Sequence, residues 1–160
     1  MKGTLSPKQS IELFEMLLFP IHTLIDMDNN MEKELKKHII NTEDFTVNDY
    51  IINTKELINI HNKTLNYISE LINNFPKIPN ETTEIDFINS YKNSVKSFEK
   101  HYSIFYFKLI QLIEKEEITL EEENYFNNNF NKFNEEIDQS LNNFFNKVES
   151  FADKFNISLI

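Results

Sequence analysis

The sequence predicts an all-α protein in which four long helices form an antiparallel up-down-up-down bundle. In four stretches of the chain, apolar residues recur at steps of three and four, which is the spacing of one helix face. No segment alternates apolar and polar residues as a half-buried strand would. The connections between the stretches are short, so neighbouring helices must run in opposite directions. We therefore expect one domain that spans residues 1–160.

The first helix is predicted over residues 7–40. Ser6 and Gln9 have the spacing of a capping box, and Pro7 fits the first helical position. The inward face is formed by Ile11, Phe14, Leu18, Ile21, Ile25, Leu35 and Ile39. Pro20 predicts a kink, because proline removes one backbone hydrogen bond from a helix interior.

Polar residues interrupt this face in its second half. Asp28 and Glu32 fall where the helical register requires apolar residues. A break into two shorter helices at residues 28–30 is the alternative to one kinked helix.

The second and third helices are predicted over residues 47–75 and 84–116. The inward face of the second is Ile51, Thr54, Ile58, His61, Leu65, Ile68, Ile72 and Phe75. That of the third is Ile88, Tyr91, Val95, Phe98, Tyr102, Phe105, Leu109 and Leu112. The second helix stops before Pro76, because the residue preceding a proline is disfavoured in helical geometry.

The fourth helix is predicted over residues 120–156 and has the clearest pattern. Its apolar stripe is Phe126, Phe130, Phe133, Ile137, Leu141, Phe144, Val148, Phe151 and Phe155. Thr119 and Glu122 predict a second capping box at its start. A helix with such an aromatic stripe is stable only when other helices cover it.

The composition excludes several classes of chemistry. The chain has no cysteine, which rules out disulfides, thiolate catalysis and Cys-ligated metals. Gly3 is the only glycine, whereas phosphate-binding loops, dinucleotide turns and nucleophile elbows need glycine at a tight turn. No catalytic motif stands out among the remaining residues. We therefore expect a protein that is not an enzyme and that has no cofactor.

The charge excludes another class of function. The formal net charge is -10, and all 16 basic residues are lysine. Direct nucleic-acid binding is not expected, because it needs a basic surface and favours arginine. An acidic inhibitor that mimics nucleic acid is a weaker alternative. No stretch reaches the ~18 charge-free apolar residues of a membrane span, and the first residues do not resemble a signal peptide. A cytoplasmic location is the expectation.

Four histidines raise the alternative of a metal- or small-ligand-binding bundle centred on His61. If the helices turn back at the expected connections, His61 and His101 lie near the middle of the bundle, with His22, Asp26 and Glu135 at a similar level. Imidazole and carboxylate groups together suit a transition metal. The competing interpretation is a buried histidine that bonds a neighbouring side chain.

The residues around His101, Phe98 to Tyr102, are similar to a short segment of hemerythrin-like domains. The carboxylate that such a domain carries four residues after the histidine is replaced here by Phe105, and after His61 by Leu65. The resemblance therefore does not assign the chain to that family.

Two apolar stripes fall outside the predicted inward faces. The first stripe is Ile104, Phe107 and Ile110 on the third helix, and the second is Leu13, Met16 and Phe19 on the first helix. Several exposed apolar residues on one stripe are typical of an interaction surface. The sequence thus favours an interaction protein that binds a protein partner, or itself as a homodimer, through one of these stripes.

Overall fold

The computed structural model describes residues 5–36, 39–41, 46–47, 54–76, 82–115 and 119–159. The prediction of an all-α chain with four long helices is confirmed. The elements are α1 (Pro7–Lys36), α2 (Thr54–Asn73), α3 (Thr82–Lys100), the π-helix η1 (His101–Tyr106), α4 (Phe107–Glu114) and α5 (Leu120–Phe155). Between α1 and α2 lie two short strands, β1 (Ile39–Asn41) and β2 (Thr46–Val47), which the sequence pattern does not predict.

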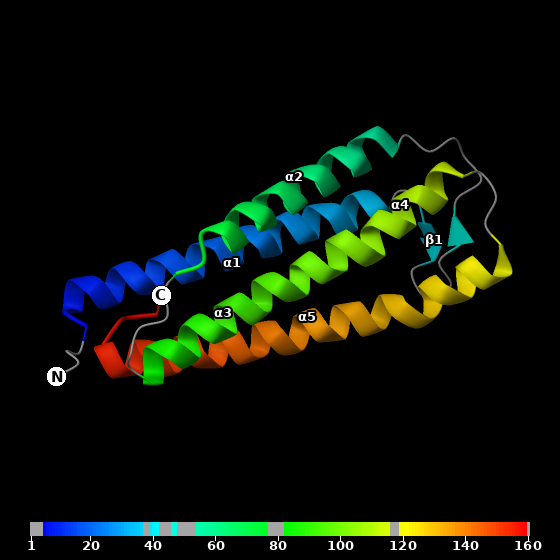
Figure 1. The fold of residues 1–160 in the computed structure, drawn as a ribbon. Helices are drawn as coiled ribbons and strands as arrows, with labels where there is room; N and C mark the ends of the chain where they lie inside the picture. Colours follow the sequence, from blue (N-terminus) through cyan, green and yellow to red (C-terminus); the bar gives the residue numbers. More distant parts are fainter. Residues whose placement is uncertain are drawn as a thin grey trace.

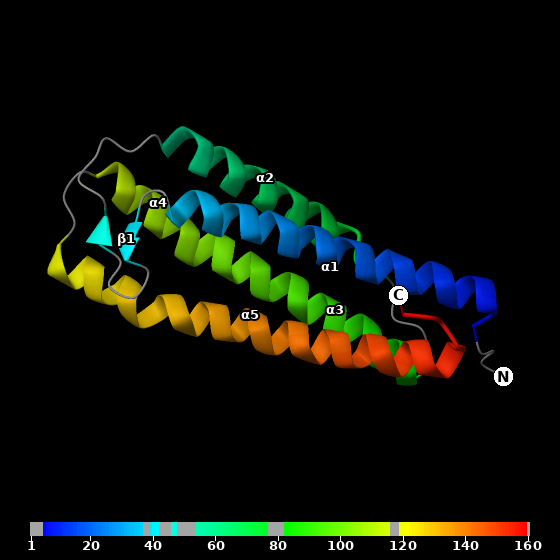
Figure 2. The same cartoon turned by 180° about the vertical axis from the view of Figure 1, so that it is seen from behind.

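The helices lie side by side along one long axis (Figures 1 and 2). α1 packs against α2, α3 packs against α5, and further contacts join α2 to α3 and α1 to α5. The start of α1 and the end of α5 lie at one end of the molecule, and α4, β1 and the start of α5 lie at the other (Figure 1). The buried faces of these helices form one core. The predicted inward face of α1 is wrong in part, because Ile11 is 46% exposed, and Leu17 and Leu24 are fully buried whereas Leu18 and Ile25 are only partly buried.

Aromatic rings from three helices fill the core near the start of α1. The ring centroid of Phe87 in α3 lies 4.6 Å from that of Phe151 and 5.8 Å from that of Phe144, both in α5. Phe14 in α1 stacks on Phe151 at 6.4 Å. All four side chains are buried. Such aromatic pairs contribute about 0.5–1.5 kcal/mol each beyond their buried area, so the stripe of α5 ties α1 to α3 as its sequence predicts.

Both predicted capping boxes are present. The Ser6 N–H donates to Gln9 Oε1 at 3.0 Å, and the Gln9 N–H donates to Ser6 Oγ at 3.1 Å. Thr119 and Glu122 make the equivalent pair of bonds at the start of α5. Each box satisfies N–H groups that have no partner within the helix, which explains why α1 and α5 begin where the sequence predicts.

α1 is one continuous helix with Pro20 inside it. The alternative of a break at residues 28–30 is wrong, because the buried face resumes at Met31 and Leu35. Asp28 is tolerated on the half-buried side of the helix because its carboxylate accepts a hydrogen bond from another helix.

The connection between α1 and α2 differs most from the prediction. α1 ends at Lys36 instead of residue 40, and α2 begins at Thr54 instead of residue 47. β1 and β2 pair in antiparallel fashion, with Ile39 opposite Val47. Isoleucine, threonine and valine are β-branched and favour strands. Residues 48–53, predicted as helix, lie outside the described residues.

The third predicted helix is unbroken from Thr82 to Glu114, but its middle six residues form η1. A π-helix bonds residue i to residue i+5, so one extra residue is accommodated in the turn. Here the Phe107 N–H donates to the carbonyl of Tyr102, five residues earlier, and also to that of Ile104. Side chains after η1 are consequently rotated relative to those of a regular α-helix.

This rotation corrects the placement of Ile110. The sequence pattern predicts that Ile110 is exposed beside Ile104 and Phe107. Ile104 and Phe107 are indeed 46% and 52% exposed, but Ile110 is only 7% exposed and belongs to the core. The expectation of an exposed Ile110 is wrong because it assumes regular α-helical spacing through η1.

Substituting Ile110 by alanine tests this assignment. We expect Ile110→Ala to lower the free energy of unfolding by about 2–4 kcal/mol, because it removes buried methyl groups. Phe107→Ala should change it by less than about 1 kcal/mol, because half of that side chain is already in water. Urea unfolding followed by circular dichroism measures both. Equal losses would show that the helix keeps a regular register.

Candidate functional sites: a buried polar junction and an exposed apolar patch

Two hydrogen bonds between helices meet at one residue of η1. His61 Nε2 of α2 lies 2.7 Å from the backbone oxygen of Tyr102. Because a carbonyl oxygen can only accept, Nε2 carries the hydrogen in this contact. The Tyr102 hydroxyl donates to Asp28 Oδ1 of α1 at 2.8 Å. We call Asp28, His61 and Tyr102 the polar junction, and it links three helices.

The junction depends on the geometry of η1. The Tyr102 carbonyl accepts both the bond from the Phe107 N–H and the bond from His61. Two lone pairs allow this arrangement. The Tyr102 ring is fully buried and stacks on the His61 ring with centroids 6.0 Å apart. Tyr102 is thus held through its backbone by α2 and through its side chain by α1.

The electrostatics of the junction are dominated by burial. Burial raises the pKa of Asp28 to about 7; the Tyr102 hydrogen bond opposes this rise, and the negative charges of Glu32 and Asp138 add to it. Burial, together with the Asp28 charge, also raises the pKa of Tyr102 and of Tyr106 well above the usual range. Both tyrosines therefore keep their protons at neutral pH, whereas Asp28 titrates there.

His101 lies next to the junction but does not join it. Its ring is fully buried and stacks on the ring of Phe105, with centroids 5.3 Å apart. It also makes a T-shaped contact with the ring of Tyr106, with centroids 4.3 Å apart. Within the described part of the chain, neither ring nitrogen of His101 has a hydrogen-bond partner. The hydroxyl of Tyr106 has none there either. Burial lowers the pKa of His101 to about 3, so the ring is neutral at physiological pH.

The five residues of the metal hypothesis are not brought together. His22, Asp26 and Glu135 are exposed, whereas His61 and His101 are buried. Nε2 of His61 is directed at the Tyr102 carbonyl, and His101 is surrounded by aromatic rings. Over the described ranges, no three His, Asp or Glu side chains are grouped so that they could hold a metal ion.

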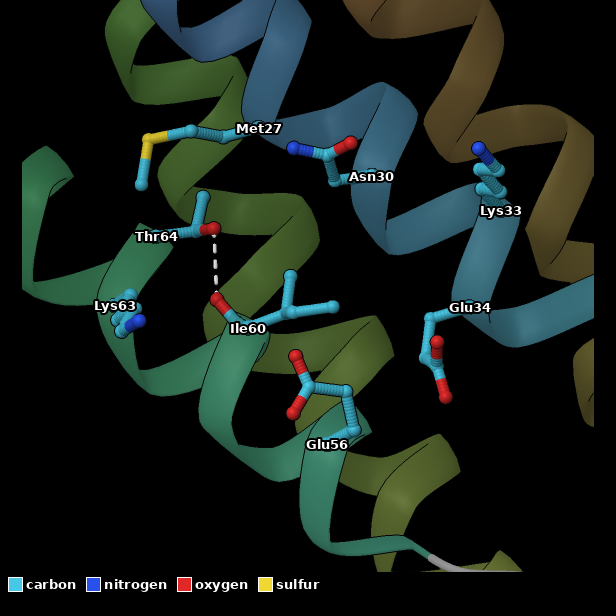
Figure 3. A pocket seen from close by; sticks show the side chains of 8 residues that line it. All are labelled: Met27, Asn30, Lys33, Glu34, Glu56, Ile60, Lys63 and Thr64. Carbon is cyan, nitrogen blue, oxygen red and sulfur yellow. Dashed lines mark hydrogen bonds between the residues drawn. The ribbon is translucent and has the colours of Figure 1, made fainter.

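A groove of about 390 Å³ runs along the solvent side of the same helix segments, between α1 and α2 (Figure 3). Its lining residues are Met27, Asn30, Lys33, Glu34, Glu56, Ile60, Lys63 and Thr64. The one buried hydroxyl, that of Thr64, already donates to the Ile60 carbonyl at 2.8 Å. Since the charged side chains have both signs, the groove favours no single class of ligand.

The predicted stripe on α1 is exposed at two of its three residues. Phe19 is 70% exposed and Met16 is 52% exposed, whereas Leu13 is half-buried against the core. Glu12 and Glu15 line the same surface depression. We call Met16 and Phe19, with these two glutamates beside them, the α1 patch.

The second predicted stripe is smaller than expected. Ile104 and Phe107 are exposed, but Ile110 is not. Ile104 and Phe107 belong to η1 and the start of α4, whereas the α1 patch belongs to the first half of α1. α4 and the start of α1 lie at opposite ends of the molecule (Figure 1). The two stripes are therefore separate surfaces and do not form one continuous face.

The sequence pattern misses the roles of Asp28 and Tyr102. Tyr102 fits an ordinary inward position, so nothing in its spacing indicates that its hydroxyl and carbonyl join three helices. Asp28 does leave a signal, because a carboxylate at an inward position needs a hydrogen-bonding partner. Pairing it with Tyr102, 74 residues away, requires the structure.

Comparisons with models of protein families, with curated proteins and with solved structures gave no match. Among the helices that the structure describes, none combines the length and the apolar character needed to cross a membrane.

The titration of Asp28 predicts how stability depends on pH. The folded pKa of about 7 lies above the ordinary aspartate pKa of 3.8, so the folded state binds more protons than the unfolded state between these pH values. The protonated Asp28 therefore favours the folded state. Its contribution to the free energy of unfolding is complete below about pH 4 and is lost as the pH rises through 7. Asp28→Asn keeps an oxygen acceptor for Tyr102 and cannot ionise. We expect its free energy of unfolding to rise relative to wild type by about 3–4 kcal/mol between pH 4 and 8.

The matched control is Asp26→Asn, which changes an exposed carboxylate on the same helix. Urea unfolding at several pH values measures all three proteins. A constant difference between Asp28→Asn and wild type across this range would contradict the assigned titration.

Proposed function

We propose that this chain is a non-enzymatic interaction protein that binds a protein partner through the α1 patch. The observation that carries this proposal is the exposure of Phe19. A side chain of this size is 70% exposed in a chain whose other large aromatic residues are mostly buried in the core. Covering a Phe side chain fully contributes about 1.5–3 kcal/mol, which makes Phe19 the natural centre of an interface.

The surroundings of the patch favour a particular kind of partner. Glu12 and Glu15 lie beside Met16 and Phe19, and the whole chain has a formal net charge of -10. A second copy of the chain would bring the same carboxylates face to face across a twofold interface. A partner segment with apolar residues flanked by lysine or arginine is complementary in both respects.

We further propose that the four helices form the antiparallel up-down-up-down bundle expected from the sequence. The pairing of α1 with α2 and of α3 with α5 supports it, as does the closeness in sequence of Lys115 and Thr119, which end α4 and begin α5. In such a bundle the exposed side of α1 is held rigidly by the core behind it. A preformed surface of this kind binds without a large ordering cost.

A capture experiment tests the proposal. Tagged wild-type protein, Phe19→Ser and Phe107→Ser are used as baits in a lysate of the native host. We expect wild type and Phe107→Ser to retain the same partner and Phe19→Ser to lose it at least about tenfold, because the central apolar contact is gone. Binding should also weaken at high salt, since the glutamates are exposed.

Phe107→Ser is the matched control, because it makes the same change at another exposed phenylalanine. Thermal melts first establish that all baits are folded. Partner loss with Phe107→Ser alone would place the interface on the α4 side. Equal retention by all three baits would contradict a role for either surface. Native mass spectrometry of the purified protein identifies a homodimer, which would contradict the proposed basic partner.

A further inference from the structure

The apolar pattern of the third long helix fits two different registers. Phe105, Leu109 and Leu112 are buried in the structure, and the same three residues face inward when the sequence is read as a continuous α-helix. Ile110 behaves differently: it is 7% exposed in the structure, which contains η1, whereas regular α-helical spacing places it outside the inward face. In the continuous α-helical register, Ile110 would stand beside Ile104 and Phe107 on the outer side.

The polar junction holds the same turn from two sides. Tyr102 lies inside η1 and is bonded to α2 through its carbonyl and to α1 through its hydroxyl. Both bonds act on the turn where the π-type bond from Phe107 forms. α4, which follows, has only eight residues, so a change of register in η1 would turn only a short helix.

We infer that η1 is a register switch, in which the hydrogen bonds of Tyr102 to Asp28 and His61 hold Ile110 in the core. When either bond is broken, the equilibrium moves toward an α-helical η1, and α4 rotates. Ile104, Phe107 and Ile110 then form one exposed apolar stripe. On one side, the burial of Ile110 and the two hydrogen bonds of Tyr102 favour the observed register. On the other side, the poorer backbone bonding of a π-helix favours the α-helical register. The terms on the first side favour the observed register, so breaking hydrogen bonds at the junction moves the equilibrium toward the α-helical register.

This inference is independent of the α1 patch. The second surface consists of Ile104, Phe107 and Ile110. It is incomplete while Tyr102 is hydrogen-bonded to Asp28 and His61, because Ile110 is then buried. Any event that competes for the Tyr102 hydroxyl or for His61 would complete that surface.

Cysteine labelling tests the switch, because the chain contains no cysteine of its own. Phe107→Cys and Ile110→Cys are each made in the wild-type background and in a junction background that carries Tyr102→Phe with His61→Leu. In the wild-type background we expect the thiol at position 107 to react at least about 100-fold faster than the thiol at position 110. In the junction background, the reaction at position 110 should accelerate at least about tenfold.

Val148→Ala provides the matched control, since it removes a buried contact in α5 and leaves the junction intact. It should leave the thiol at position 110 protected. If the double substitution does not fold, Tyr102→Phe alone, which removes one hydroxyl, serves as the junction background. A thiol at position 110 that stays fully protected there, or one that is exposed equally by Val148→Ala, would overturn the switch.

Discussion

The register of the third long helix depends on Tyr102. Its backbone carbonyl receives a hydrogen from His61, and its hydroxyl donates to Asp28, so α1 and α2 both hold the π-helical turn in place. The rotation introduced there buries Ile110 and separates it from Ile104 and Phe107. In this proposal, the two hydrogen bonds of Tyr102 determine whether Ile110 is buried or exposed. They do so because the free-energy cost of leaving these polar groups unpaired exceeds the strain of the π-turn.

The two exposed apolar surfaces differ in how they are built. The α1 patch lies on a helix whose opposite side is locked by aromatic packing, as in the contact of Phe14 with Phe151. It is therefore a fixed surface, and the glutamates beside it favour a basic partner. The surface around Phe107 lies on the short helix after η1 and depends on the register there. The α1 patch is thus exposed whatever the register of η1, whereas in our proposal the polar junction controls the surface around Phe107.

Periodicity in the sequence predicts the helices well and their interruptions poorly. The stripe of α5 and the caps at Ser6 and Thr119 follow from spacing and local hydrogen bonding, so they could be predicted. β1 and β2 could not, because a helical pattern extends into them and their pairing is non-local. The π-turn leaves no mark in the spacing either. For the site, exposure of Phe19 and Met16 follows from the pattern, whereas the link between Asp28 and Tyr102 spans two helices and needs the fold.

Deleting one residue from η1 tests most directly whether the π-turn sets the register. Ser103 is exposed and lies inside η1. Its removal turns the bond between Phe107 and Tyr102 into an ordinary α-helical one and leaves the later side chains where they are. We predict a melting temperature close to that of wild type, whereas deletion of the exposed Gln139 from the regular helix α5 should unfold the protein. If both deletions are equally damaging, η1 does not hold an inserted residue and the account is wrong.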